Sequence, residues 1–279
     1  MYFIEILKVI FFGIVEGITE WLPISSTGHM ILLEEFLKLK VSPDFFEMFL
    51  VVIQLGAICA VPVLFWEKLY PFSRKKTKEE NNQIIDLWMK VIVGVAPAAI
   101  VGVLLDDVLD LYLYNYIVVA IALIVYGVAF ILVEKNRAER EFRVNSIFDL
   151  TYTDAIKIGA YQMLSLIPGT SRSGSTILGG MLTGVSREAS AEFSFFMAIP
   201  VMAGASALKI LKFILDGISI SGEEIGLLII GIIVSFVVSF YAIRFLMDFV
   251  KRNNFKIFGY YRIGLGAIVL FYFLIKVLV

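Results

Sequence analysis

The chain has 279 residues, of which 59% are hydrophobic and 18% are charged, and its formal net charge at pH 7 is -1. A soluble domain has roughly 45–50% apolar and about 25% charged residues, so this composition excludes an ordinary soluble protein and indicates a polytopic membrane protein. The single cysteine excludes an intrachain disulfide.

The chain contains two broken apolar segments, and each is followed by three continuous ones. The first segment, 1–40, is interrupted at Pro23, and a later one, 154–184, is interrupted at Pro168. Each half of these segments is too short to span the membrane alone, since a span needs roughly 20 predominantly apolar residues in succession. The continuous segments predict six spans, at about 46–66, 87–105 and 113–133 and then at about 190–213, 224–249 and 257–278.

The charges between these segments give an orientation. Lysine and arginine are concentrated at 67–90, 134–157 and 251–262, ranges that include Lys90 and Arg262, whereas the connections around Asp106 and at 216–224 have none. By the positive-inside rule the three basic connections are cytoplasmic and the two acidic ones lie outside. Segment 1–40 then begins and ends outside, and 154–184 begins and ends inside. Full crossing by both segments, the alternative, would conflict with these charges.

The two broken segments also resemble each other. Gly13–Ser26 aligns with Gly159–Arg172 if one gap is allowed, and Gln162 then occupies the position of Glu16. Similar segments with opposite orientation indicate an inverted repeat, whose interrupted helices meet near the membrane midplane and form the site. The predicted fold is an all-α polytopic membrane protein with six transmembrane helices and two re-entrant helical hairpins. We expect a single integral membrane domain, 1–279, with repeat 1 at about 1–133 and repeat 2 at about 154–279.

The first hairpin contains candidate catalytic and metal-binding groups. Glu16 and Glu20 are four residues apart, which places both carboxylates on one face of a helix. Hard divalent cations take oxygen ligands, and ionisable residues inside a membrane are functional candidates by default. A solvated helix end or a structural pair of carboxyl groups is the alternative interpretation.

A run of hydroxyl groups and the only histidine follow the break in this hairpin: Ser25, Ser26, Thr27 and His29. Serine and threonine alone are common helix caps. Beside a histidine they suggest an activated hydroxyl group or a general acid or base.

The second hairpin contains Pro168-Gly-Thr-Ser171-Arg172-Ser173-Gly-Ser175-Thr176. A helix N-terminus with free N–H groups binds anions, and arginine offers a planar fork to phosphate oxygens. A capped helix with a snorkelling arginine is the alternative. Together the two hairpins suit a phosphate ester or anhydride embedded in the membrane, with charge stabilisation of the phosphoryl oxygens as the main catalytic effect.

These motifs resemble the bacterial undecaprenyl-pyrophosphate phosphatases, the bacitracin-resistance phosphatases. The glutamate-rich signature is matched by Glu16-Gly-Ile-Thr-Glu20 followed by LPISSTGH, and the PGxSRSxxT signature is matched at Pro168–Thr176. Flanking residues Gly184–Pro200 are similar as well, so the resemblance covers essentially the whole chain.

The resemblance implies hydrolysis of the terminal phosphate of a C55 polyprenyl diphosphate at a site open to the outer face of the bacterial cell membrane. It implies that Glu16 and Glu20 are catalytic or bind a divalent cation, Mg²⁺ or Ca²⁺, and that Arg172 is catalytic. Ser26 and His29 are the candidates for nucleophile and base, with attack by His29 or by water as alternatives. The phosphate-binding candidates are Ser25, Thr27, Ser171, Ser173 and Thr176. A homodimer is compatible with the resemblance.

Two other functions fit part of the pattern. An inverted repeat with broken helices is also typical of transporters, so a polyprenyl-phosphate flippase would use much the same lipid-phosphate site. A structural protein that merely binds lipid leaves the intramembrane carboxylates and Arg172 unexplained. The basic connections predict a topology and contact with anionic lipid rather than a nucleic-acid partner.

Overall fold

The computed structural model describes residues 2–113, 115–137 and 141–278, and the regular secondary structure within them is helical apart from one isolated bridge between Val144 and Val185. The side chain of Asp106, used above for orientation, lies outside the described residues. The helices of the first half are α1 (Tyr2–Thr19), α2 (Ser26–Phe36), α3 (Pro43–Leu64), α4 (Trp66–Leu69), α5 (Lys78–Leu113) and α6 (Tyr116–Arg137). Those of the second half are η1 (Ile147–Asp149), α7 (Tyr152–Met163), η2 (Leu164–Leu166), α8 (Arg172–Leu182), α9 (Arg187–Leu215), α10 (Gly222–Arg252) and α11 (Lys256–Leu278).

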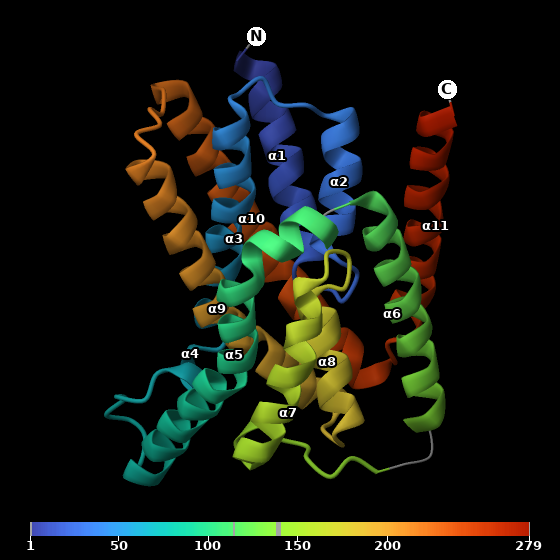
Figure 1. Ribbon diagram of the computed structural model, residues 1–279. Helices are drawn as coiled ribbons and strands as arrows, with labels where there is room; N and C mark the ends of the chain where they lie inside the picture. The colour runs from blue at the N-terminus through green and yellow to red at the C-terminus, as the bar shows by residue number, and fades with distance from the viewer. Residues whose placement is uncertain (1, 114, 138–140, 279) are drawn as a thin grey trace.

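Six helices of the described chain are long and apolar enough to cross a membrane, namely α3, α5, α6, α9, α10 and α11. The prediction of six spans in an all-α polytopic membrane protein is confirmed. The remaining long helices form two hairpins. Helices α1 and α2 descend and return from the end of the bundle where the chain begins, and α7 and α8 enter from the opposite end (Figure 1).

The two hairpins turn in the same way. Ser25 and Ser171, each the residue before the returning helix, both have φ of 73°, a left-handed conformation that residues other than glycine rarely adopt. The Ser25 hydroxyl accepts a hydrogen bond from the N–H of Gly28, and the Ser171 hydroxyl accepts one from the N–H of Gly174. Each serine therefore caps its helix and keeps the polar turn fixed at membrane depth.

The packing of the helices supports the proposed repeat. Helix α1 packs on α10 and α7 packs on α5, while α3 packs on α9 and α6 on α11. The contact between α6 and α11 is reciprocal: a Cβ on Gly127 would lie 2.7 Å from the carbonyl oxygen of Gly259, and a Cβ on Gly259 would lie 2.7 Å from that of Gly127. Two similar halves related by a two-fold axis would form helix pairs that are equivalent in this way.

Two of the basic residues that we assigned to connections are buried inside long helices instead. Lys90 is buried in α5, where its ammonium group lies 2.5 Å from a carboxylate oxygen of Asp86. Arg262 lies in α11 and is fully buried. The loop prediction was wrong for both because α5 begins at Lys78 and α11 at Lys256, so charged residues form the first turns of each helix.

Candidate functional site

A cavity of about 430 Å³ lies between the two hairpins and helices α5 and α9. Its polar part is lined by Glu20, Ser26, Thr27, Gln54, Gln162, Ser165, Ser171 and Arg172. Its apolar part is lined by residues of α5 and α9, including Ala98, Ala99, Val103, Val201, Gly204 and Leu208. One cavity thus combines charged groups from both hairpins with an apolar passage between two spans.

Glu20 connects the two hairpins at the polar end of this cavity. Its Oε1 accepts hydrogen bonds from Arg172, at 3.0 Å from Nη2 and 3.3 Å from Nε, and its Oε2 accepts one from the Ser26 hydroxyl at 3.1 Å. Glu20 is buried, and the side chain of Arg172 is 11% exposed. Removing one partner of such a pair would leave the other charge uncompensated in a low-dielectric environment.

Arg172 is held in place from two further directions. Its Nη1 donates to the carbonyl oxygen of Ser194 on α9 at 2.9 Å, and its guanidinium carbon lies 5.9 Å from the ring centre of Trp21. Arg172 is also the first residue of α8, where free backbone N–H groups favour an anion. The arginine is therefore fixed at the edge of the cavity rather than extended toward the membrane surface, which contradicts the snorkelling alternative.

Glu16 lies one turn before Glu20 and is 1% exposed. Its Oε1 has no hydrogen-bond partner among the described residues. A buried carboxylate oxygen without a donor is costly, so Glu16 requires a proton or a cation. A divalent cation fits this pair of acids, since it takes oxygen ligands and accepts water and phosphate as the remaining ones. The described residues contain no group of three or more His, Cys, Asp or Glu side chains that could hold a metal without such help.

His29 does not contact Ser26, contrary to our expectation that one helical turn would bring them together. Its Nδ1 lies 2.7 Å from the carbonyl oxygen of Ser25, which can only accept, so Nδ1 carries the proton in the neutral ring. Nε2 lies 2.6 Å from the hydroxyl of Tyr261, whose ring stacks on the imidazole. The side chain therefore folds back over the preceding turn, and the recorded partner of the Ser26 hydroxyl is Glu20.

The other candidate phosphate ligands differ in their surroundings. Thr27 and Ser171 line the cavity, whereas Ser25 is fully buried as the cap of α2. Ser173 donates to the carbonyl oxygen of Glu20 at 3.0 Å, and Thr176 donates to that of Arg172 at 2.8 Å. The Ser173 hydroxyl thus joins the two loops, and the Thr176 hydroxyl bonds within its own helix, so both positions favour a supporting role over direct contact with phosphate.

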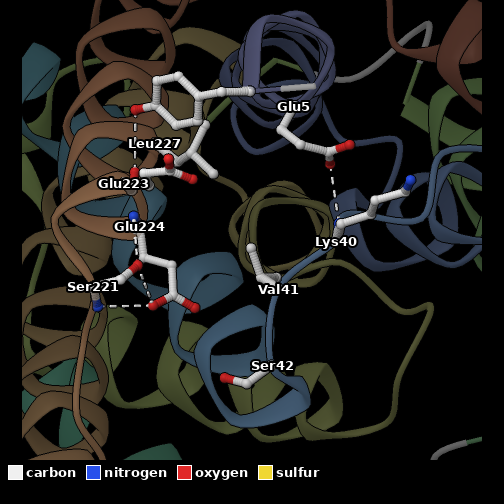
Figure 2. A pocket seen from close by; sticks show the side chains of 9 residues that line it. Glu5, Lys40, Val41, Ser42, Ser221, Glu223, Glu224 and Leu227 are labelled. Atoms are coloured by element: carbon white, nitrogen blue, oxygen red, sulfur yellow. Dashed lines mark hydrogen bonds between the residues drawn. The ribbon is translucent and has the colours of Figure 1, made fainter.

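A second cavity, of about 500 Å³, lies at the end of the bundle where the chain begins (Figure 2). It is lined by Glu5, Glu223 and Glu224, and the carboxylates of Glu5 and Glu224 have hydrogen-bond partners. Glu5 accepts hydrogen bonds from the N–H of Lys40 and from the Lys8 ammonium group, and Glu224 accepts from Ser221 as part of the cap of α10. Gln162, which lines the cavity between the hairpins, in contrast has buried polar atoms without partners in the described structure, and this favours that cavity as the site.

The family model described as "Bacitracin resistance protein BacA" matches residues 9–268. The chain belongs to the BacA family. It is 55% identical over 274 residues to a protein of Desulfitobacterium hafniense, covering 98% of each chain, and 56% identical over 271 residues to one of Acetivibrio thermocellus, covering 97% of this chain and 98% of the relative. A Streptococcus mutans protein is 53% identical over 279 residues, covering 100% of this chain and 99% of the relative. All three relatives are named undecaprenyl-diphosphatase.

In this BacA-family chain the structural role of Arg262, which we had assigned to a basic connection, was not predicted from the sequence. Its Nη1 donates to the carbonyl oxygen of Pro23 at 3.2 Å, and its Nη2 donates to those of Gly169 and Thr170 at 2.9 and 2.8 Å. One guanidinium group thus satisfies backbone carbonyls from both re-entrant loops. The signal in the sequence was a charged residue six positions inside an apolar segment.

Proposed function

We propose that this chain hydrolyses the terminal phosphate of undecaprenyl diphosphate and releases undecaprenyl phosphate and inorganic phosphate. The observation that carries the proposal is the single cavity in which Arg172, Glu20 and Ser26 meet at the polar end and apolar residues of α5 and α9 form the rest. A diphosphate on a polyprenyl chain has the same division into a charged head and an apolar tail. The names of the relatives state this activity.

The polar network provides a path for the first chemical step. An entering phosphate competes for Arg172, so the guanidinium group turns its donors from Glu20 to the phosphoryl oxygens. The released Glu20 carboxylate accepts the proton of Ser26, whose oxygen attacks the terminal phosphorus while the bond to the bridging oxygen breaks. Undecaprenyl phosphate leaves, and water then cleaves the phosphoserine. In the alternative mechanisms, water is the nucleophile or His29 is the base. His29 could accept a proton at Nε2 only when the Tyr261 hydroxyl releases that nitrogen.

Glu16 and Glu20 would hold the divalent cation, Mg²⁺ or Ca²⁺. The unpartnered Oε1 of Glu16 supports this assignment. When bound, a divalent cation neutralises part of the charge on the phosphoryl oxygens. Without it, two buried carboxylates would repel the diphosphate, and Arg172 alone would oppose that repulsion.

The proposed division of roles between Glu20 and His29 gives a testable difference. Glu20→Gln is expected to lower kcat about 100-fold because it removes the proton acceptor beside Ser26. Tyr261→Phe is expected to keep at least half of the wild-type kcat, since it removes only the hydroxyl group that occupies His29 Nε2. Both are measured as steady-state phosphate release. Equal losses in Tyr261→Phe and Glu20→Gln would show that the Tyr261–His29 pair is part of the proton path.

The apolar part of the cavity would take the prenyl chain between α5 and α9. A Cβ added at Gly204 meets no atom within 4 Å, so a large side chain fits there without disturbing the fold and fills the passage. Gly204→Phe is expected to raise the KM for undecaprenyl diphosphate about tenfold, because burial of tail methylenes is lost, and to leave hydrolysis of farnesyl diphosphate unchanged.

Gly264 provides a matched control for this prediction. It lies in α11, is exposed, and also has open space around an added Cβ. Gly264→Phe should keep the wild-type KM for both substrates. If both variants raised the KM for undecaprenyl diphosphate equally and left farnesyl diphosphate unaffected, the passage between α5 and α9 would not be the place that holds the tail.

The charged connections support an orientation for the proposed reaction. The segment between α4 and α5, the start of the segment before α7 and the end of α10 carry Lys75, Arg143 and Arg252. These segments lie at the end of the bundle opposite to the start of α1 (Figure 1), so that end would face the cytoplasm. The cavity residues of α9, from Pro200 to Leu208, run toward the other end, where α9 finishes. We therefore propose a protein of the bacterial cell membrane whose site opens outward, where it would recycle the lipid carrier used in cell-wall synthesis.

The deciding experiment measures phosphate release from undecaprenyl diphosphate by the purified chain in detergent, with and without EDTA. Release that stops with EDTA and returns with Mg²⁺ or Ca²⁺ would support a cation-dependent phosphatase. No release from folded protein under any of these conditions would contradict the proposal and favour a flippase. The comparisons give that alternative no support, because the relatives are named as phosphatases.

A further inference from the structure

Gln162 has buried polar atoms that nothing in the described structure satisfies. It lies in the last turn of α7, is 1% exposed, and lines the cavity between the hairpins. Neither its Nε2 nor its Oε1 has a hydrogen-bond partner among the described residues. An amide is strongly disfavoured in an apolar environment without hydrogen bonds, so this side chain calls for a partner inside the cavity.

The repeat shows what kind of partner the amide suits. Gln162 occupies the position of Glu16, and Arg172 occupies that of Ser26, as the first residue of the returning helix. The first hairpin presents the Glu20 carboxylate to the cavity, and the second presents an amide and a guanidinium group. A carboxylate favours a cation, while the N–H donors of the second hairpin favour an anion. The two hairpins thus give the cavity one side that suits a cation and one that suits an anion.

We propose that Gln162 is a diphosphate-binding residue whose Nε2 donates a hydrogen bond to a non-bridging oxygen of the substrate that Arg172 does not hold. The proposal rests on the function proposed above and adds a second donor to the anion side of the site. An amide is suited to this position because it donates to the anion and carries no charge. A glutamate at 162 would instead add a carboxylate to the cavity that Glu20 already lines, and it would repel the diphosphate.

The test compares Gln162→Met and Gln162→Glu with the wild-type protein. Gln162→Met keeps the length of the side chain and loses the donor, so we expect the KM for undecaprenyl diphosphate to rise about tenfold, with kcat within threefold. Gln162→Glu should raise it further. The inhibition constant of inorganic pyrophosphate, measured at a fixed concentration of free Mg²⁺, should rise in parallel in both variants.

Ser165→Ala is the matched control. The Ser165 hydroxyl also lines the cavity, but it donates to the backbone carbonyl of Gln162 at 2.6 Å, so its bonding is local. We expect its KM and inhibition constant to stay within twofold of the wild type. Melting temperatures in detergent verify that each variant is folded, and Gln162→Met decides the result if Gln162→Glu does not fold.

Unchanged inhibition by pyrophosphate in folded Gln162→Met would overturn the proposal, as would a wild-type protein that does not bind pyrophosphate at all. Failure of the proposed function gives a different result. In that case the wild type releases no phosphate from the lipid, while pyrophosphate binding, followed by calorimetry, still falls when Gln162 is replaced.

Discussion

Replacing Arg172 with alanine is expected to lower kcat/KM for undecaprenyl diphosphate about 1000-fold. Removal of one preorganised donor at a developing negative charge typically lowers the rate by about 100-fold to 1000-fold. Arg172 carries several N–H donors on one guanidinium group, so we expect the upper end of that range. The substitution also leaves Glu20 without the partner at 3.0 Å that compensates its charge. Steady-state phosphate release by the purified variant measures the effect.

Arg172→Lys separates charge from geometry in this experiment. Lysine keeps the positive charge but cannot bond Glu20, the Ser194 carbonyl and a phosphate with one planar group. We expect it to retain more activity than alanine and to remain at least tenfold below the wild type. A folded Arg172→Ala protein with more than a tenth of wild-type kcat/KM would show that the arginine is not part of the chemical site.

Arg262→Ala is expected to destabilise the protein by about 3–5 kcal/mol, because a large buried side chain is truncated and buried acceptors lose their donors. Three backbone carbonyls, of Pro23, Gly169 and Thr170, lose their donors, and a fully buried side chain leaves a void. In a chain of this size the melting temperature should fall by about 10 °C. Thermal unfolding in detergent, followed by intrinsic fluorescence, measures the change.

Arg244→Ala is the control for this prediction, because Arg244 is exposed on α10 and its recorded contact is with the ring of Phe240. Its melting temperature should stay within 2 °C of the wild type. If Arg262→Ala behaved like this control, the guanidinium group would not hold the two loops. Activity should fall together with stability, since the same loops carry Glu20 and Arg172.

The sequence predicts the spans and part of the site for the same physical reason. An uninterrupted apolar segment has to cross the bilayer, and a polar group inside one is expensive enough to require a role. Glu20, Ser26 and Arg172 stand out in this way, and the structure brings all three together.

Other features depend on contacts that no local pattern contains. Arg262 bonds Pro23 across 239 positions, and its proximity to Lys256 made it look like part of a basic connection. Tyr261 lies 232 positions from His29, so its hydroxyl could not be foreseen as the partner of the imidazole. The expected contact between Ser26 and His29 failed because the ring nitrogen bonds the carbonyl of Ser25 instead.

The bonds made by Arg262 also set an order of assembly during synthesis. Both re-entrant loops are complete once residue 172 has been made, but the group that fastens their carbonyls is on the last helix. Until α11 has been inserted, the loops carry unsatisfied backbone groups at membrane depth, which are costly there. A ribosome-bound chain ending before Arg262 should therefore contain every proposed catalytic residue and still lack an ordered active site.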